Sequence, residues 1–225
     1  MRAASFDLFH AGATRVRTPA LVPEVRLGLA DDLAALWRAR EAWTGHPGGP
    51  APYWGVAWPG GQALARFLLD RPDLVAGRTV LDMGSGSGLC AIAAAVAGAR
   101  EVVAADTDPH ACLAIARNAS LNAVRVATRT EDPIACTGQW DVILAADLWY
   151  ERFLAQRVTG WLAAQARGGA NVYLADPGRA FFPRQGLEEL ACHAFAPEPG
   201  LEPGPQALAR VWRFRSPAAG AAFRP

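Results

Sequence analysis

A glycine-rich segment, Asp82-Met83-Gly84-Ser85-Gly86-Ser87-Gly88, has the residue types and spacing of a ligand-binding loop. It lies between an apolar run typical of a strand and an Ala-rich run typical of a helix. Glycine lets a backbone approach a ligand closely, and parallel sheets bind ligands at the carboxyl ends of their strands. Asp106 ends the next apolar run, 18 residues after Gly88, where its two oxygens could accept hydrogen bonds from two ribose hydroxyls. The spacing therefore predicts a ligand that contains a nucleoside.

Two classes of ligand fit this loop. The run Gly86-x-Gly88-x-x-Ala91 matches the dinucleotide fingerprint, which is typical of nicotinamide-dependent oxidoreductases. Asp82 argues against that class, because a carboxylate two residues before the first glycine would repel a pyrophosphate. S-adenosylmethionine instead brings an ammonium and a sulfonium to such a loop, and the whole pattern resembles that of Rossmann-like methyltransferases. The cofactor-binding residues expected in the loop are Asp82, Gly84, Ser85, Gly86 and Gly88.

Strands and helices alternate from residue 77 onward and must position these residues. Strands are expected at residues 79–84, 101–106, 125–128, 140–150, 171–178 and 209–215, and helices at 89–99, 108–122, before Arg167 and at 183–193. Strands separated by helices, with apolar residues on both faces, indicate a parallel sheet covered on both sides. The expected fold class is α/β, a Rossmann-like three-layer sandwich.

Residues 1–57 differ in composition from residues 58–225, and we expect them to form an N-terminal arm and lid within the same domain. Asp31 and Asp32 could cap a helix that runs to about Trp43.

The segment at residues 44–55, TGHPGGPAPYWG, is too rich in Gly and Pro for regular structure. Trp54 and Trp58 lie around Gly55 at its end, where they would pack poorly in a helix or strand. We therefore expect both tryptophans to cover the ligand. A helix is predicted at residues 62–70, ending before Pro72.

The composition excludes several classes of function. The chain has 225 residues, 52% of them hydrophobic, which suits one ordinary domain and excludes disorder. The formal net charge of +1 provides no electrostatic case for nucleic acid or an anionic membrane. No apolar run reaches the roughly 18–20 residues of a membrane span. All 22 basic residues are Arg, so the protein has no lysine of its own to modify.

The cysteines and histidines are scattered. No two of the four cysteines form a C-x-x-C pair, and the four histidines share no ligand spacing. We therefore expect no metal and no disulfide framework. A bacterial cytoplasm is the expected location, with the mitochondrial matrix as the alternative.

Several further segments resemble one family over nearly the whole chain. They are PEVRL (23–27), PYWGVAWPGGQALARFLLD (52–70), VLDMGSGSG (80–88), DLWYE (147–151), LADPGR (174–179) and VWRF (211–214). Together they look like the lysine methyltransferases of the electron transfer flavoprotein beta subunit. The first ~20 residues and residues 196–208 carry no usable resemblance.

The resemblance implies a seven-strand methyltransferase sheet in the order 3-2-1-4-5-7-6, with the last strand antiparallel. It also implies that the glycine loop holds the methionyl end of S-adenosylmethionine and that Asp106 holds the ribose. Thr107 is a candidate contact for the sugar or the adenine. Glu131 and Asp132 compete for the adenine amino group, with Asp132 as the chosen candidate and a solvated turn before Pro133 as the alternative.

Asp147 and Tyr150 are the catalytic candidates, because they match the Asp-x-x-Tyr motif of this lysine-modifying family. A carboxylate directly after VILAA, at the functional edge of the sheet, is also a costly place for a charge without a role. The alternative for Asp147 is an N-cap of the helix that follows. Asp176 and Arg179 are candidates for substrate binding, and a simple turn is the alternative for them.

The function implied is S-adenosylmethionine-dependent methylation of a protein lysine, with the beta subunit of the electron transfer flavoprotein as suspected substrate. Asp147 alone is a poor activator of the amine, because a carboxylate favours the protonated form. We expect it to capture and orient the ammonium, with Tyr150 shaping the pocket. Alternatives are methylation of a ribosomal protein or of a small amine such as nicotinamide, a nicotinamide-dinucleotide oxidoreductase, and an inactive binding module. We expect a monomer that binds neither nucleic acid nor membranes.

Overall fold

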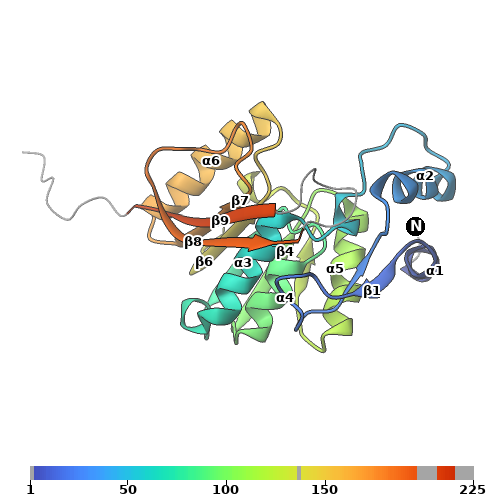
Figure 1. Cartoon of the computed structure of the whole chain (residues 1–225), viewed down its shortest axis with the longest axis horizontal. Coiled ribbons are helices and arrows are strands. Elements are labelled where there is room, and N and C mark those ends of the chain that lie inside the picture. The colour runs from blue at the N-terminus through green and yellow to red at the C-terminus, as the bar shows by residue number, and fades with distance from the viewer. Residues whose placement is uncertain (1–2, 136–137, 197–206, 216–225) are drawn as a thin grey trace, which may run out of the picture.

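A seven-stranded sheet forms the centre of the part of the chain that the computed structural model describes, residues 3–135, 138–196 and 207–215 (Figure 1). In sheet order the strands are β5 (Ala127–Arg129), β4 (Glu101–Ala105), β3 (Thr79–Met83), β6 (Val142–Ala146), β7 (Asn171–Asp176), β9 (Ala207–Phe214) and β8 (Leu187–Phe195). The pairs from β5 through β7 are parallel, whereas β9 runs antiparallel to β7 and β8. The order 3-2-1-4-5-7-6 with an antiparallel last strand is thereby confirmed.

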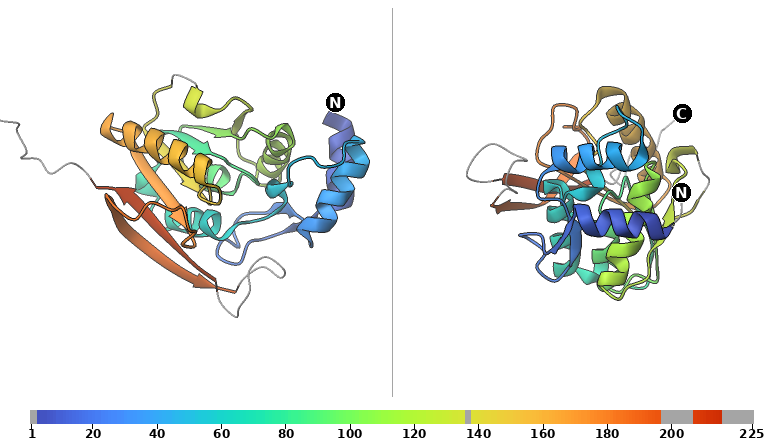
Figure 2. Two further views of the ribbon diagram at one scale, coloured as in Figure 1. Left: turned by 90° about the horizontal axis from the view of Figure 1, so that it is seen from above. Right: turned by 90° about the vertical axis from the view of Figure 1, so that its right-hand side faces the viewer.

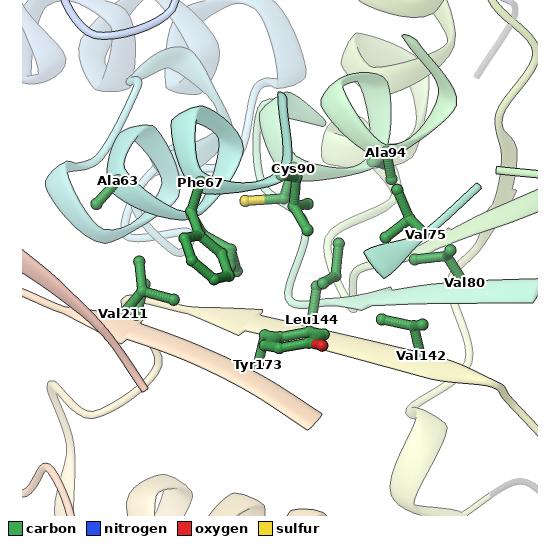
Figure 3. Close-up of a cluster of buried hydrophobic side chains, with 14 of the residues drawn as sticks. Ala63, Phe67, Val75, Val80, Cys90, Ala94, Val142, Leu144, Tyr173 and Val211 are labelled. Atoms are coloured by element: carbon green, nitrogen blue, oxygen red, sulfur yellow. The ribbon is translucent and has the colours of Figure 1, made fainter. Parts of the chain in front are cut away.

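The central strands are buried on both faces because successive residues alternate between two apolar clusters. Along β3, Val80 lies in one cluster and Leu81 in the other. Figure 3 shows the first cluster, in which Tyr173 of β7 lies beneath Phe67, and Val80 and Val142 lie beneath Val75. This two-sided burial explains why β3, β4, β6 and β7 are short, continuous apolar runs that sequence patterns identify well.

Helices cover both faces of the sheet, as Figure 2 shows. The first face packs against α3 (Pro59–Asp70), α4 (Leu89–Val96) and α5 (Pro109–Leu121), and the other against α6 (Arg152–Arg167). The expected three-layer α/β sandwich is therefore confirmed. No helix among the described residues is long and apolar enough to cross a membrane.

The N-terminal arm packs beside α5. Its elements are α1 (Ala3–Ala13), β1 (Arg15–Arg17), β2 (Leu27–Leu29), α2 (Leu33–Thr44) and the 3-10 turn η1 (Tyr53–Gly55). The predicted α2 is confirmed, and the Asp32 side chain caps it by accepting from Ala35 N at 2.8 Å. Sequence patterns missed α1 and the β1–β2 pair.

The helix predicted at residues 183–193 is wrong. Leu187–Phe195 is the edge strand β8, which pairs with β9 from Leu187 opposite Phe214 to Phe195 opposite Ala207. The run LEELACH contains good helix formers, but a long antiparallel partner overrides that local preference. Leu187 and Phe195, at the two ends of the strand, are buried. The residues between them are exposed or half-buried.

The cysteines at positions 90, 112 and 192 are free thiols, and Cys136 lies outside the described residues.

Candidate active site

Four carboxylates lie where parallel strands end. Asp82 is the penultimate residue of β3 and Asp106 directly follows β4, while Asp147 follows β6 and Asp176 ends β7. These strands are neighbours, so their carboxyl ends share one edge of the sheet. The charge of Asp106 contributes to a raised pKa of Asp82, and the charge of Asp176 contributes to a raised pKa of Asp147, each after the larger effect of burial. The edge therefore concentrates negative charge.

The glycine loop connects β3 to α4 in a backbone conformation that suits glycine. Gly84 and Gly88 have φ values of 63° and 84°, and a Cβ at Gly84 would come within 2.4 Å of Leu148 Cδ2. A Cβ at Gly86 would meet no heavy atom within 4 Å. The middle of the loop therefore faces open space, where a ligand can approach the backbone.

Asp82 lies beneath the loop and is only 2% exposed. Its carboxylate accepts from Ser85 Oγ at 2.5 Å and from Ala91 N at 3.0 Å. Burial raises the pKa of Asp82 to about 7, against the effect of these two hydrogen bonds. These two hydrogen bonds let Asp82 hold the loop against the start of α4. The negative charge that the sequence suggested for this position is a second contribution.

Asp106 holds the other side of the loop. Its two oxygens accept from Gly86 N and Asp108 N, both at 2.9 Å. An ionised carboxylate has about four acceptor positions, so each oxygen keeps one for a hydroxyl. Burial raises the pKa of Asp106. A carboxylate with free acceptor positions beside an open glycine backbone fits a ribose, and Thr107 is exposed next to it.

The two acids after β5 have different surroundings. Asp132 accepts from Ile134 N at 2.9 Å and pairs with Arg157 of α6 at 2.5 Å. Glu131 is exposed. Asp132 therefore already stabilises the turn and its contact with α6, and the adenine contact predicted for it stays a prediction.

Asp147 has an unusual backbone and a built-in set of partners. Its φ is 60°, in the left-handed region that few residues other than glycine adopt, and its side chain is almost buried. The Asp147 N–H donates to Ala175 O at 3.0 Å, and its carboxylate accepts from Gly61 N at 2.8 Å. Burial raises the pKa of Asp147, although Arg179 acts in the opposite direction.

The hydrogen bond from Gly61 shows that Asp147 caps the start of α3, although it lies far from that helix in the sequence. Gly61 lies in the first turn of α3, whose own N-cap residue Trp58 makes no side-chain capping bond. Free N–H groups at a helix start favour a carboxylate. The following helix α6 is capped instead by Glu151, which accepts from Phe153 N and Leu154 N. The interpretation of Asp147 as the cap of α6 is therefore wrong.

Arg179 reaches across to Asp147. Its guanidinium donates to Asp147 Oδ1 and to Asp176 Oδ2, the latter at 3.2 Å. Asp176 Oδ1 accepts from Gly178 N and Arg179 N at 2.7 and 2.6 Å, which closes the turn after β7. Asp176 thus closes the simple turn that was the alternative to a role in substrate binding. The same turn places the Arg179 side chain against Asp147.

Aromatic rings lie beside this ion-pair network. Trp58 and Tyr53 have ring centroids 5.7 Å apart, as do Tyr53 and Tyr150, and Arg179 Cζ is 6.0 Å from the Trp58 ring. Tyr53 and Tyr150 are 44% and 52% exposed. The three rings therefore form an apolar, accessible rim next to Asp147, and Tyr53 was not among the predicted site residues.

Trp54 lies elsewhere. It is 1% exposed and its ring centroid is 5.7 Å from Phe6 and 5.6 Å from His10 in the N-terminal arm. That burial is typical of a core side chain rather than of a mobile cover. The expectation that both tryptophans cover the ligand does not fit this position for Trp54.

Gly60 and Gly61 are site residues that sequence patterns alone did not single out. The sequence does contain a local indication of such a role. Pro59 suits the first position of a helix, and the two glycines after it leave the start of that helix open to a close neighbour. The identity of that neighbour depends on tertiary structure.

The chain is similar to known methyltransferases. A family model described as Ribosomal protein L11 methyltransferase (PrmA) matches residues 63–149. The chain is 43% identical over 182 residues to the electron transfer flavoprotein beta subunit lysine methyltransferase of Xenopus laevis, covering 79% of this chain and 71% of that protein. The protein of the same name from Danio rerio is 39% identical over 207 residues, covering 88% and 79% of the two chains.

A solved structure shares the fold. The magnesium protoporphyrin IX methyltransferase of Synechocystis PCC 6803, solved with bound SAM, matches with a TM-score of 0.51. The identity is 16%, and the match covers 69% of this chain and 78% of that one. The similarity concerns the arrangement of the sheet and its helices.

Proposed function

Because the chain belongs to the family of electron transfer flavoprotein beta subunit lysine methyltransferases, we propose that it methylates lysine side chains of that beta subunit. The methyl donor is S-adenosylmethionine, in keeping with the methyltransferase family model and the related structure that holds this cofactor. The enzyme is thus a protein-lysine N-methyltransferase.

One observation carries the proposal. Asp106 and Asp147 lie on either side of the glycine loop, because β3 is the strand between β4 and β6. Asp106 has acceptor positions suited to the nucleoside, and Asp147 lies at the start of α3 beside accessible aromatic rings. A donor held on one side of the loop would thus face an acceptor amine on the other.

The chemistry needs no protein nucleophile. When bound, S-adenosylmethionine supplies a methyl group on a positively charged sulfur, which makes that carbon electrophilic. The loop from Gly84 to Gly88 and Asp106 bind the donor, and Asp147 orients the amine in line with the bond that breaks. Alignment and exclusion of water are the main contributions left to the protein.

The acceptor amine must lose its proton before it can react. For a lysine with an ordinary pKa near 10.4, that costs about 4.6 kcal/mol at pH 7. The rings of Tyr53, Trp58 and Tyr150 lower this cost by providing an apolar surface, which favours the neutral form. We assign Tyr150 the role of shaping this entrance.

The beta subunit is a better candidate than a ribosomal protein. The ribosomal protein L11 family model covers residues 63–149, from α3 to just past β6, which is the cofactor-binding part of the fold. The relatives from Xenopus laevis and Danio rerio match most of the chain, including the parts beyond that range. The bacterial cytoplasm and the monomeric state stay predictions.

Transfer of label from S-adenosylmethionine tests the proposal. The purified beta subunit should acquire labelled methyl groups on lysine, whereas ribosomal protein L11 and nicotinamide should stay unlabelled under the same conditions. Asp106→Ala is the matched control, because it weakens donor binding without altering the acceptor side. Labelling of L11 or nicotinamide in place of the beta subunit would overturn the choice of substrate.

A binding measurement tests the cofactor class. S-adenosylhomocysteine at a hundredfold excess over its dissociation constant should stabilise the fold by about 2.7 kcal/mol, and NAD should not. A thermal shift with NAD alone would favour the oxidoreductase.

A further inference from the structure

The guanidinium of Arg179 already lies beside Asp147, where the ammonium of a substrate lysine would otherwise pair with this carboxylate. Its guanidinium pairs with Asp147 and lies 3.2 Å from Asp176 Oδ2. The Arg179 side chain is 20% exposed, against 9% for Asp147 and 0% for Asp176. An incoming lysine at Asp147 would therefore meet a fixed cation.

The backbone around Arg179 resists its displacement. The N–H groups of Gly178 and Arg179 both donate to Asp176 Oδ1, and Gly178 makes the turn possible with a φ of 105°. Withdrawal of the guanidinium would leave Asp147 and Asp176 buried without their cation, which is strongly unfavourable. The geometry favours an Arg179 that stays in place while the substrate binds.

A fixed arginine changes what Asp147 can do to a lysine. A lone carboxylate favours the ammonium form, which cannot accept a methyl group. A guanidinium stays charged at any pH at which the enzyme works, and it disfavours a second cation beside it. Asp147 still has acceptor positions free, because its two oxygens take one hydrogen bond each from Arg179 and Gly61.

We infer that Arg179 is a positioning residue that stays paired with Asp147 during methyl transfer, so that the site accepts the substrate lysine as a neutral amine. This inference rests on the proposed function and extends it to the protonation state of the acceptor. Asp147 then orients the amine by accepting a hydrogen bond from it.

The step balances without a further reagent. The lysine ammonium gives its proton to water before it docks. The nitrogen lone pair forms the new N–C bond as the C–S bond breaks, and the pair of electrons from that bond stays on sulfur. The positive charge passes to the methylated nitrogen, which leaves as an ammonium, so that one proton is released for each methyl group transferred.

The other titratable groups near this position keep a constant charge while the amine titrates. Burial raises the pKa of Cys90 on α4 well above its ordinary value, and also raises that of Tyr150. Asp82, with a pKa of about 7, is mostly ionised above that pH. A window from about pH 8 to about pH 9.5 therefore isolates the amine.

The pH dependence of kcat tests the inference, because kcat reports ionisation in the enzyme–substrate complex. Arg179→Gln removes a nearby positive charge and should raise the pKa of the bound lysine amine by about one unit or more. The value of kcat should therefore fall about tenfold at pH 8 and about threefold or less at pH 9.5, where more of the amine is neutral. Arg179→Lys keeps the charge and should restore the wild-type profile. The exposed Arg184, in the same segment between β7 and β8, provides the control Arg184→Gln, which should change neither value.

Two results would overturn the inference. An equal loss at both pH values would give Arg179 a purely structural or substrate-docking role. A faster Arg179→Gln enzyme would mean that the guanidinium competes with the substrate.

A second measurement does not depend on the identity of the protein substrate. The enzyme loaded with S-adenosylhomocysteine is titrated with n-butylamine, an analogue of the lysine side chain, while NMR follows the Gly61 N–H that donates to Asp147. Affinity for total amine should rise about tenfold or more from pH 8 to pH 9.5 in the wild type, and should not rise in Arg179→Gln.

The two measurements separate failure of the inference from failure of the proposed function. Affinity that falls with pH in the wild type, or no binding at either pH, would contradict the inference. A wild-type enzyme that binds the amine as expected and never labels the beta subunit would contradict the proposed function instead.

Discussion

Gly60 lies directly against the carboxylate of Asp147: a Cβ at Gly60 would approach Asp147 Oδ2 to 2.7 Å. The same Cβ would lie 2.7 Å from Ala175 O. The missing side chain therefore lets the first turn of α3 press against the ends of β6 and β7. This contact is what allows Gly61 N to reach Asp147 at 2.8 Å.

Gly60→Ala should displace Asp147 without touching the cofactor loop. A shift near 1 Å at a reacting centre can cost about a hundredfold in rate, so methylation should fall by about ten- to a hundredfold. Affinity for S-adenosylhomocysteine, measured by calorimetry, should stay within about threefold, since Asp106 and the loop are unchanged. The control is Gly160→Ala on α6, where a Cβ meets no atom within 4 Å. A fully active Gly60→Ala enzyme would show that the position of Asp147 is not critical.

Asp106→Ala should weaken cofactor binding by roughly 2–3 kcal/mol, because the ribose hydroxyls lose their acceptors. The loop also loses the bond from Gly86 N, so part of this change comes from a less ordered loop. Calorimetry with S-adenosylhomocysteine measures the loss. Unchanged affinity would place the ribose acceptor on another residue.

The raised pKa of Asp82 should make the free energy of unfolding depend on pH. Its pKa of about 7 in the folded state exceeds the ordinary value of 3.8, so between these values the folded state binds more protons than the unfolded state. The free energy of unfolding should therefore fall as pH rises through this window. Asp82→Asn removes this contribution, and the difference between the two proteins should change from pH 5 to pH 8 in urea titrations of the cofactor-free protein. Parallel stability curves would mean that Asp82 titrates normally.

The two tryptophans of the segment before α3 should behave differently. Trp54→Ala should lower the free energy of unfolding by about 3–5 kcal/mol, as for other buried aromatic side chains, with little change in cofactor affinity. Trp54→Phe is the milder variant if the first does not fold. Trp58→Ala should reduce methylation more than stability, because its ring lies beside Arg179. Equal effects at both positions would argue that they act together as a cover.

Sequence patterns located the parts of the fold that local residue types determine. The strands β3, β4, β6 and β7 are apolar on both faces, and Asp32 marks the start of α2 by a local capping bond. The edge strand β8 was missed because its helix-forming residues are overridden by pairing with β9, a non-local partner.

The site shows the same division. Asp147 was identifiable because a carboxylate after a buried strand is costly without a role. Its pairing with Arg179 was not, because the two residues are 32 positions apart and meet only through the turn that Asp176 builds. Trp54 and Trp58 could not be told apart either, since Trp54 lies within η1 and packs against the N-terminal arm, whereas Trp58 lies at the start of α3 beside Arg179.

Asp147→Asn is the most direct test of the central claim, that Asp147 orients the acceptor lysine beside a separately bound cofactor. The substitution keeps the shape of the side chain and removes its charge, so affinity for S-adenosylhomocysteine should stay near that of the wild type. The rate of methylation of the beta subunit should fall by about two orders of magnitude or more, as for loss of a well-placed charged group at a reacting centre. Both quantities are measured on one preparation of the variant. A rate that stays near wild type would reduce Asp147 to a cap of α3, and a parallel fall in affinity and rate would place it in the cofactor site.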